Sequence, residues 1–366
     1  MDKKKILIVG QTPPPYHGQA IMIQNTLNHE YENLEIYHVR MEFSKEMQEV
    51  GKFGFYKVFQ LIKLIFKIIY NRFRYNINNL YYPPAGPDNV AIIRDLMILS
   101  CVRWMFSSTI YHFRAGGISQ KVDTYPSLLK AIVKFILGKP DLTIRLSSRN
   151  PRDGEYFKTL RDVVVPNGIK DFSKNYSLEG RKGSTILFVG ALKKTKGVMD
   201  ILTAVKLMKQ STEDFQMHFM GKFDDSEFEE QCKEFIQSEQ LHMVRFLGVK
   251  TDAAKWDEFA LSDIFCFPSF YESETFGNVL LEAMQFKIPV VATFWRGIPD
   301  IVVDGETGYL VPINRPDLIC EKLLALLHNY EVRLRMGEKG KKRYLETFTE
   351  NLYYKNFEKE VYRACK

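Results

Sequence analysis

The 366-residue sequence has little cysteine, and no two cysteines have a spacing that suggests a functional pair. Its five cysteines stand alone, without the separation of a zinc site or a redox motif. Their odd number does not suit a disulfide framework. These absences favour a reducing compartment and exclude the small secreted domains that disulfides hold together.

Long apolar runs and low-complexity stretches are also missing. The first strand-like segment has only four apolar residues before Gly10, too few for the core of a signal peptide. No run approaches the roughly 18 apolar residues that a transmembrane helix needs. We therefore expect a cytoplasmic protein with neither an export signal nor a membrane span.

The composition itself is that of a globular protein, with 45% hydrophobic and 26% charged residues. The net charge of +7 is uneven, because residues 1–170 carry 24 Lys and Arg against 14 Asp and Glu, whereas the remainder carries 27 against 30. A basic first half indicates an anionic partner such as nucleic acid, acidic lipid headgroups or a phosphorylated acceptor. The alternative is that surface charge is simply scattered unevenly.

Short apolar runs alternate with helical patterns in both halves of the chain. The expected strands are 5–10, 34–39, 109–113, 141–147, one that ends at 163–165, 185–190, 215–220, 243–247, 263–267 and 288–293. The expected helices are 54–75, 90–106, 126–138, 197–210, 226–238 and 277–286. This alternation predicts an α/β protein with two Rossmann-like, doubly wound parallel-sheet domains that face a cleft.

A polar turn near residue 170 divides the two halves. We expect an N-terminal Rossmann-like domain at 1–170 and a C-terminal Rossmann-like domain at 171–345. A helix at 346–366 is expected to pack back toward the first domain.

Residues 268–284 carry the clearest chemical pattern, a strand and a loop followed by a helix with Gly277 in its first turn. Thr275 is the expected N-cap. The helix start offers amide N–H groups and the positive end of the dipole. Glu274 before it and Glu282 within it add carboxylates that accept hydrogen bonds from sugar hydroxyls. By spacing alone, a capped core helix with two surface acids remains an equal alternative.

Three lysines, Lys193, Lys194 and Lys196, precede Gly197 between a strand and a helix. Lysines at a helix N-terminus oppose the dipole, which favours a site that an anion normally occupies. The spacing is not that of a P-loop. The alternative is a solvated basic turn.

Two strand ends in the first half give weaker signals. Prolines follow the first strand, and Gly18 then opens a helix that could bring backbone amides near a reacting sugar. His112 stands at a strand end ahead of a glycine pair. Both patterns also occur for structural reasons, and a lone histidine is more often structural than catalytic.

These ordered motifs together resemble glycosyltransferase family 4, whose members are retaining enzymes of the GT-B fold. Glu274 and Glu282 reproduce the family's pair of glutamates, within a likeness that is strongest over 189–312. The further matching segments are 165–168, 246–248, 289–293, 297–302 and 304–308.

The resemblance implies that the domain at 1–170 binds the acceptor and that the domain at 171–345 binds the nucleotide sugar. It also implies roles for residues of the second half. Glu274 would contact the transferred sugar, Glu282 would hold the ribose hydroxyls, and Lys196 would bind phosphate. The amides expected to face the sugar and diphosphate are those of Phe276, Gly277 and Asn278.

In the first half, the resemblance matches Gly18 to a loop near the diphosphate and His112 to a histidine that approaches the sugar. The chain departs from the family at Ala191, where many members carry a second phosphate-binding arginine. Lys193 or Lys194 would have to compensate, and we expect Lys194 to join the donor site.

The implied enzyme is a metal-independent, retaining hexosyl- or N-acetylhexosaminyltransferase (EC 2.4). It would use a nucleotide-diphosphate sugar, with UDP-sugars favoured, as co-substrate and would need no cofactor and no metal. A non-catalytic binding protein is disfavoured because Lys196, Glu274 and Glu282 are all present. A nucleic-acid-binding protein lacks a recognition motif, and a phosphate-ester hydrolase lacks a metal or nucleophile constellation.

The segment 54–75 points to the acceptor. Its polar residues form one stripe at helical spacing, and the rest of the helix is apolar or aromatic. Such a pattern suits a helix in the interface of an anionic membrane, or else a buried helix. We expect a lipid-linked glycan acceptor in cell-surface polysaccharide assembly, with the enzyme peripheral on the inner face of the plasma membrane. A soluble small-molecule acceptor is the alternative.

Overall fold

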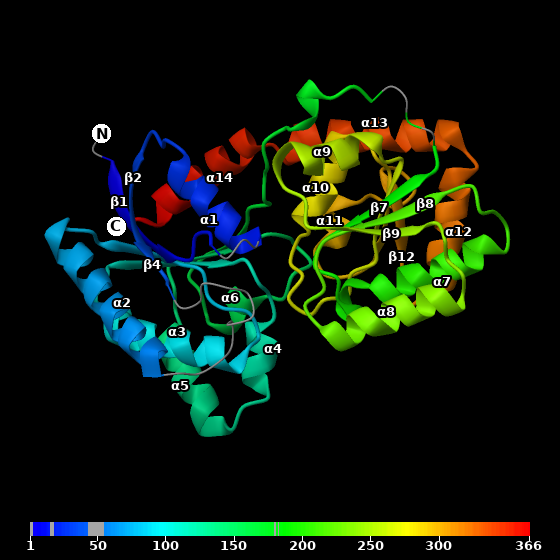
Figure 1. Cartoon of the computed structure of the whole chain (residues 1–366). Coiled ribbons are helices and arrows are strands. Elements are labelled where there is room, and N and C mark those ends of the chain that lie inside the picture. The colour runs from blue at the N-terminus through cyan, green and yellow to red at the C-terminus, as the bar shows by residue number, and fades with distance from the viewer. Residues whose placement is uncertain (1–2, 15–17, 43–54, 179–180, 182) are drawn as a thin grey trace. The chain divides into compact units, whose positions relative to one another are not determined.

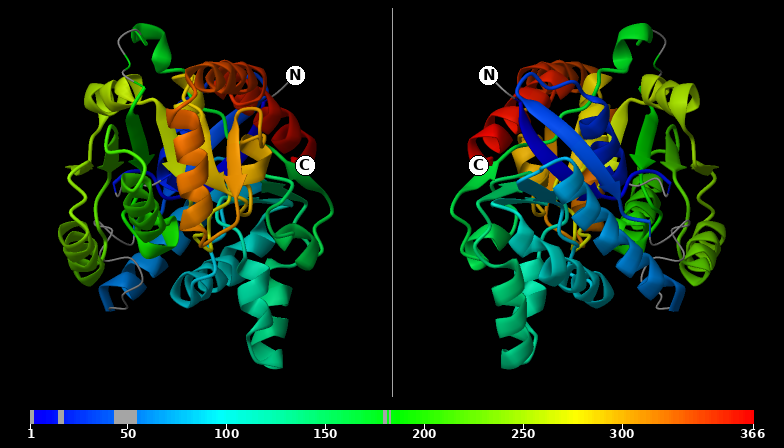
Figure 2. Two further views of the ribbon diagram at one scale, coloured as in Figure 1. Left: turned by 90° about the vertical axis from the view of Figure 1, so that its right-hand side faces the viewer. Right: turned by 90° about the vertical axis from the view of Figure 1, so that its left-hand side faces the viewer.

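The computed structural model describes residues 3–14, 18–42, 55–178, 181 and 183–366 (Figures 1 and 2). The chain forms two compact units. Unit 1 comprises Met1–Pro166 and Asn351–Lys366, and unit 2 comprises Asn167–Glu350. Each unit contains a six-stranded sheet whose named strands all pair in parallel, which confirms the predicted α/β class.

The sheet of unit 1 has the strand order β2-β1-β3-β4-β5-β6. Its strands are β1 (Lys4–Gly10), β2 (Leu34–Arg40), β3 (Asn79–Tyr82), β4 (Ser108–Phe113), β5 (Leu142–Arg145) and β6 (Asp162–Val164). Every residue of β3 and β4 is buried, because helices cover both faces of the sheet. The direction of winding reverses between β1 and β3, so the topological switch point of this unit lies there.

Strand β3 is not among the strands that the sequence predicts. Its four residues lie between a polar stretch and Pro83, and four residues are too few for a period to be recognised. Its place beside β1 comes from burial on both faces, which only the assembled sheet provides. The same holds for β12 (Gly308–Val311) in unit 2.

Helices cover the two faces of the first sheet (Figure 1). Those on one face are α2 (Phe55–Arg74), α3 (Asn89–Val102) and α5 (Ser127–Leu137), and those on the other are α1 (Gly18–Asn28) and α14 (Glu350–Ala364). The short helices α4 (Ile118–Asp123) and α6 (Asp153–Tyr156) follow β4 and β5.

The predicted amphipathic segment 54–75 is helix α2, and it combines the two alternatives. Leu61, Leu64 and Ile68 are buried in the core against the sheet. The opposite side of the helix nevertheless exposes aromatic residues, with Phe66 at 67% and Phe73 at 65%. The helix is therefore part of the core on one side and an uncovered apolar surface on the other.

Helix α14 completes unit 1, although it is the last element of the chain. Its Tyr353 and Phe357 are buried, and the Phe357 ring lies 5.7 Å from Tyr81 and 5.9 Å from Tyr31, centroid to centroid. The hydroxyls of Tyr353 and Thr26 are 3.3 Å apart. The aromatic residues of this helix thus close the face of the sheet that α2, α3 and α5 leave open.

Unit 2 has the strand order β12-β11-β10-β7-β8-β9, the order of a dinucleotide-binding fold. Its remaining strands are β7 (Thr185–Val189), β8 (Gln216–Met220), β9 (Val244–Gly248), β10 (Ile264–Phe267) and β11 (Val290–Thr293). Its helices are α7 (Val198–Lys209), α8 (Ser226–Ser238), α9 (Asp252–Leu261), α10 (Asn278–Gln285), α11 (Ile298–Ile301), α12 (Pro316–Leu327) and α13 (Tyr330–Thr347). The winding reverses between β7 and β10.

Candidate donor site

The loops that follow β7 and β10 lie side by side at the switch point of unit 2. The Phe270 amide donates to the carbonyl of Thr195 at 2.9 Å. Gly197 has φ +77, and a Cβ there would lie 2.4 Å from the carbonyl oxygen of Pro268. Only glycine permits this approach. The lysine turn and the glutamate segment, about 80 residues apart in the sequence, thereby form one site.

Lys196 and Glu274 meet in this site as an ion pair. The Lys196 ammonium donates to Glu274 Oε2, which also accepts from the Ser269 hydroxyl at 3.2 Å. Both side chains are largely buried, with exposures of 16% and 11%. The ammonium also lies 5.0 Å from the centre of the Tyr271 ring, a cation–π distance. A phosphate that entered here would compete with Glu274 for the lysine and release the carboxylate to accept from a sugar hydroxyl.

Helix α10 begins at Asn278, and its N-cap is Gly277 with φ +87 and no side-chain capping bond. The prediction of Thr275 as the N-cap is therefore wrong. A Cβ at Gly277 would lie only 3.2 Å from the Leu280 side chain, and the positive φ favours glycine. The N-cap position is therefore held by a residue that has no side chain to cap the helix. The orphan N–H groups of the first turn remain with the positive end of the dipole.

The side chains of Phe276 and Asn278, the two residues next to Gly277, contact other parts of unit 2. Phe276 is buried, and its ring packs edge-on against Phe348 at 5.8 Å. The Asn278 side-chain oxygen accepts from the Asn167 amide at 2.9 Å. Their side chains are thus used for anchoring, and backbone amides are the groups that these residues have left for a ligand.

Glu282 lies in the second turn of α10, and its side chain is 12% exposed. Lys255 of α9 donates to its Oε1 at 2.6 Å, while Oε2 is buried without a hydrogen-bond partner in the described part of the chain. Burial raises the pKa of this carboxyl, and Lys255 opposes that rise. Lys255 is a site residue that the sequence does not predict, because nothing in the spacing of α9 links it to α10.

The remaining lysines of the turn differ in their partners. Lys193 forms an ion pair with Asp224, whereas the Lys194 side chain is exposed. A shallow pocket between these lysines and the start of α8 is lined by Asp225 and Phe228. Lys193 is thus already neutralised, and Lys194 is the better placed of the two to take the part of the arginine absent at position 191.

Gly18 and His112 belong to unit 1. Gly18 is the exposed first residue of α1, and a Cβ there would meet nothing within 4 Å. His112 is completely buried in β4. Its Nδ1 lies 2.7 Å from the Tyr81 hydroxyl, and its ring packs at 6.5 Å from Phe357. Burial and the nearby Arg114 hold its pKa well below the usual value. In this structure the imidazole is therefore a neutral core group without access to solvent.

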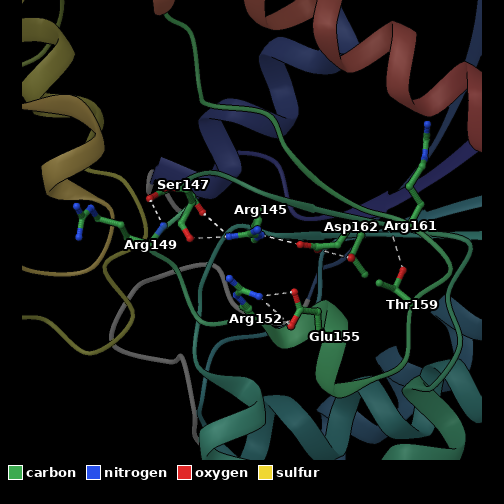
Figure 3. Close-up of polar contacts among 10 residues, drawn as sticks. Arg145, Ser147, Arg149, Arg152, Glu155, Thr159, Arg161 and Asp162 are labelled. Carbon is green, nitrogen blue, oxygen red and sulfur yellow. Dashed lines mark hydrogen bonds and ion pairs between the residues drawn. The ribbon is translucent and has the colours of Figure 1, made fainter.

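A basic loop follows β5 at the carboxyl edge of the same sheet (Figure 3). Arg145 binds Asp162 at 2.7 Å and the Ser148 carbonyl at 2.7 Å, which fixes the course of the loop. The exposed Arg149 points away from these contacts, and Arg152 pairs with Glu155 on the surface. Unit 1 thus carries exposed positive charge at the sheet edge where ligands of such folds bind.

Two features are absent from the described residues. No cluster of three or more His, Cys, Asp or Glu side chains within them has the arrangement of a metal site. No helix in the described ranges combines the length and apolar character needed to cross a bilayer.

The fold defines a class of protein, the two-domain α/β proteins of the GT-B type, each domain built on a six-stranded parallel sheet. Residues 170–343, most of unit 2, match the family described as glycosyl transferases group 1, and this part of the chain belongs to that family.

Curated relatives match between about half and three fifths of the chain. The chain is 32% identical over 183 residues to a phosphatidyl-myo-inositol mannosyltransferase of Mycobacterium leprae, covering 49% of this chain and 47% of that protein. It is 25% identical over 171 residues to the capsular polysaccharide biosynthesis glycosyltransferase CapM of Staphylococcus aureus, covering 47% and 44%. It is 30% identical over 230 residues to N-acetyl-alpha-D-glucosaminyl L-malate synthase of Bacillus anthracis, covering 62% and 55%. The chain thus spans about half the length of these relatives.

Solved structures match over nearly the whole chain. Sucrose-phosphate synthase of Thermosynechococcus elongatus has a TM-score of 0.72 at 15% identity, with 99% of this chain and 98% of that chain covered. Anabaena HepE in complex with UDP and glucose has a TM-score of 0.68 at 16% identity, with 98% and 99% covered. At these identities the likeness concerns the fold.

Proposed function

We propose that the protein is a retaining glycosyltransferase that moves a hexosyl or N-acetylhexosaminyl group from a nucleotide-diphosphate sugar to a membrane-associated, lipid-linked glycan. The reaction would serve cell-surface polysaccharide assembly at the cytoplasmic face of the membrane. The observation that supports the transfer chemistry best is the Lys196–Glu274 pair at the start of α10. The pair places two groups in one site: a cation that could bind the leaving phosphate, and a carboxylate that could accept a hydrogen bond from a sugar hydroxyl.

Departure of the nucleoside diphosphate builds negative charge on its phosphate oxygens. Lys196, with Lys194 beside it, and the first amides of α10 supply fixed positive potential there. Fixed charges and dipoles of this kind account for much of the rate enhancement of many enzymes. Glu274 would then orient the sugar, and Glu282 would hold the ribose. The acceptor would attack from the face that the diphosphate leaves, so the product keeps the configuration of the donor.

Gly18 keeps the role expected for it, with its amide near the diphosphate, and the exposed start of α1 leaves its backbone accessible. We do not include His112 among the groups that touch the sugar. Its burial in β4 and its contacts with Tyr81 and Phe357 support a role in holding the sheet against α14.

The membrane part of the proposal rests on one surface of unit 1, which we call the outer apolar face. It consists of exposed side chains of α2, of α3 with the turn after it, and of α5. Helix α3 lies between α2 and α5 and contacts both (Figure 1). The members are Phe59, Ile62, Phe66, Tyr70, Phe73, Val90, Ile93, Met97, Trp104, Leu128, Ile132 and Phe135, each between 41% and 77% exposed. The rings of Trp104 and Phe135 are 5.4 Å apart and join α3 to α5. Soluble monomers rarely leave so many large apolar side chains together in water.

The charges around the outer apolar face indicate what kind of surface would bind it. Lys63, Lys67 and Arg74 of α2 are exposed between its aromatic residues. Neither α2 nor α5 contains an Asp or Glu, and the single acid of α3, Asp95, is buried. A face whose helices present apolar side chains and cations, and no exposed carboxylate of their own, suits a bilayer with anionic headgroups. An enzyme held there would meet acceptors that are anchored in lipid.

The proposal is tested first on the donor. We expect the wild-type protein to hydrolyse slowly at least one sugar of a panel of UDP-, GDP- and ADP-sugars, and Glu274→Gln to abolish this activity while still binding the nucleotide. UDP-sugars stand first in the panel because the similar fold of HepE holds UDP. A protein that binds no nucleotide sugar would refute the proposal, and a product anomer opposite to that of the donor, determined by NMR, would refute retention.

The acceptor decides between the two candidate functions. Transfer to a polyprenol diphosphate glycan in anionic vesicles, with little transfer to free sugars or small metabolites, is the expected result. The relative from Bacillus anthracis, by its name, makes a small conjugate of L-malate, and a preference for such acceptors would favour the soluble alternative.

A further inference from the structure

Lys255 is an ammonium group that the proposed chemistry does not use. It lies in the first half of α9, in unit 2, with its side chain 21% exposed. Its Nζ donates to Glu282 Oε1 at 2.6 Å and lies 4.6 Å from the centre of the Trp256 ring. Trp256 in turn stacks on Phe172 at 4.1 Å. A stacked ring therefore fixes the position of the lysine, and the lysine fixes one oxygen of the glutamate.

The other oxygen of Glu282 is the unusual one. Oε2 is buried and has no hydrogen-bond partner among the described residues. A buried carboxylate oxygen without a donor is costly, so such an atom indicates a donor that arrives with a ligand. Lys255 uses one of its three N–H donors on Oε1, which leaves donors that a neighbouring ligand oxygen could accept.

A vicinal diol matches this arrangement of one open acceptor beside spare donors. One hydroxyl donates to Oε2, and the oxygen of its neighbour accepts from Lys255. The ribose of a nucleotide carries such a diol at its 2′ and 3′ carbons, whereas a 2′-deoxyribose does not. Loss of one hydroxyl would leave a buried polar group of the protein unpaired, which is the situation in which a site discriminates most strongly.

We propose that Lys255 is a positioning residue that turns Glu282 toward the ribose diol and makes the donor site select ribonucleotides over deoxyribonucleotides. The inference rests on the proposed function, because it takes the occupant of the site to be a nucleotide. It assigns the selectivity to a pair of residues on different helices, α9 and α10, rather than to Glu282 alone. A purely structural ion pair would stabilise the unit without distinguishing ribose from deoxyribose.

The test compares the binding of UDP with that of 2′-deoxy-UDP by calorimetry. We expect the wild type to prefer UDP by about tenfold or more, the value of a lost hydrogen bond to a charged group. Lys255→Met should bring this preference close to one, and Lys255→Arg, which keeps a cation, should restore part of it. Lys250→Met is the matched control, because Lys250 pairs with Glu258 near the same helix and should keep the full preference.

The double variant Lys255→Met, Glu282→Gln should lose no more preference than Glu282→Gln alone, since the two residues act through one diol. Equal weakening of UDP and 2′-deoxy-UDP in Lys255→Met, with the preference intact, would overturn the inference and leave the proposed function standing. Thermal unfolding of each variant separates this outcome from loss of the fold. A wild type that binds neither nucleotide, nor GDP or ADP, would overturn both.

Discussion

At the scale of single residues, most charges of the donor site are paired before any ligand arrives. Lys196 neutralises Glu274, Lys193 neutralises Asp224, and Lys255 neutralises one side of Glu282. The Lys196–Glu274 and Lys255–Glu282 pairs are largely buried, and removing one partner of such a pair leaves the other charge unpaired at a cost in stability. The thermal midpoint of each variant of the site is therefore measured together with its activity.

Lys196→Gln should lower turnover by about a hundredfold or more, the usual effect of removing one charge-stabilising donor. Lys194→Gln should have a smaller effect, because Lys194 lies exposed at the rim of the turn. Steady-state kinetics with the best donor measure both. Turnover of Lys196→Gln near the wild-type value, at an unchanged thermal midpoint, would contradict the role given to this lysine.

The pH dependence of donor affinity should report Glu282. Burial raises its folded pKa above the ordinary 4.5, so the carboxylate takes up a proton at a higher pH than an exposed glutamate does. Affinity for a nucleotide sugar should thus fall as the pH falls through this raised pKa. A nucleotide sugar serves as the ligand because its diphosphate has no ionisation in that range. Calorimetric affinities for Glu282→Gln should be weaker and flat with pH, and a wild-type slope retained in this variant would assign the ionisation elsewhere.

His112 should act on stability rather than on catalysis. Its folded pKa is depressed well below 6.5, so the neutral form is bound in the fold and the unfolded chain takes up the proton first. The contribution of His112 to the free energy of unfolding is therefore complete above pH 6.5. It is lost as the pH falls toward the depressed pKa of the folded state, by at most about 1.4 kcal/mol per pH unit. Urea midpoints at pH 7.5 and 5.5 should differ less for His112→Gln than for the wild type. An equal difference in both proteins would exclude this origin of acid sensitivity.

At the scale of elements, α2 is the most informative helix, because its two sides have different partners. Leu64 and Ile68 lie in the core, so an acidic substitution there would disturb folding and says nothing about a membrane. Phe66 and Phe73 lie on the outer apolar face. A membrane role must therefore be tested on the exposed residues of the helix.

Phe66→Ser with Phe73→Ser should weaken binding to vesicles that contain anionic lipid by about tenfold or more, since each buried aromatic ring contributes on the order of 1.5–3 kcal/mol. Co-sedimentation measures the binding, and added salt should weaken it further. Leu345→Ser is the matched control, because Leu345 is 49% exposed on α13 and lies outside this face. Equal binding by both variants and the wild type would remove the outer apolar face from the proposal.

At the scale of the whole molecule, the chain leaves unit 1 at Pro166 and returns to it for α14. The last helix buries Tyr353, Tyr354, Phe357 and Val361, and its aromatic rings contact Tyr31 and Tyr81. Unit 1 is thus incomplete until α14 has been made. This connection makes the C-terminal residues part of the stability of the N-terminal sheet.

Phe357→Ala should destabilise unit 1 by about 3–5 kcal/mol, the usual cost of removing a buried ring. Lys359→Ala, at an exposed position of the same helix, should cost less than about 0.5 kcal/mol. Near-UV circular dichroism during urea unfolding follows both. A small effect of Phe357→Ala would mean that α14 is not needed by the sheet it covers.

The sequence by itself determined the α/β class, most strands and helices, and the residues of the two donor-site motifs, because these depend on local periodicity and on glycine at strand ends. Tertiary structure alone decided that β3 is a central strand, that Gly277 caps α10, that His112 is sealed in the core, and that Lys255 reaches Glu282. Each of these depends on which surfaces are buried against one another. Burial joins residues that are distant in the chain, so no local pattern records it.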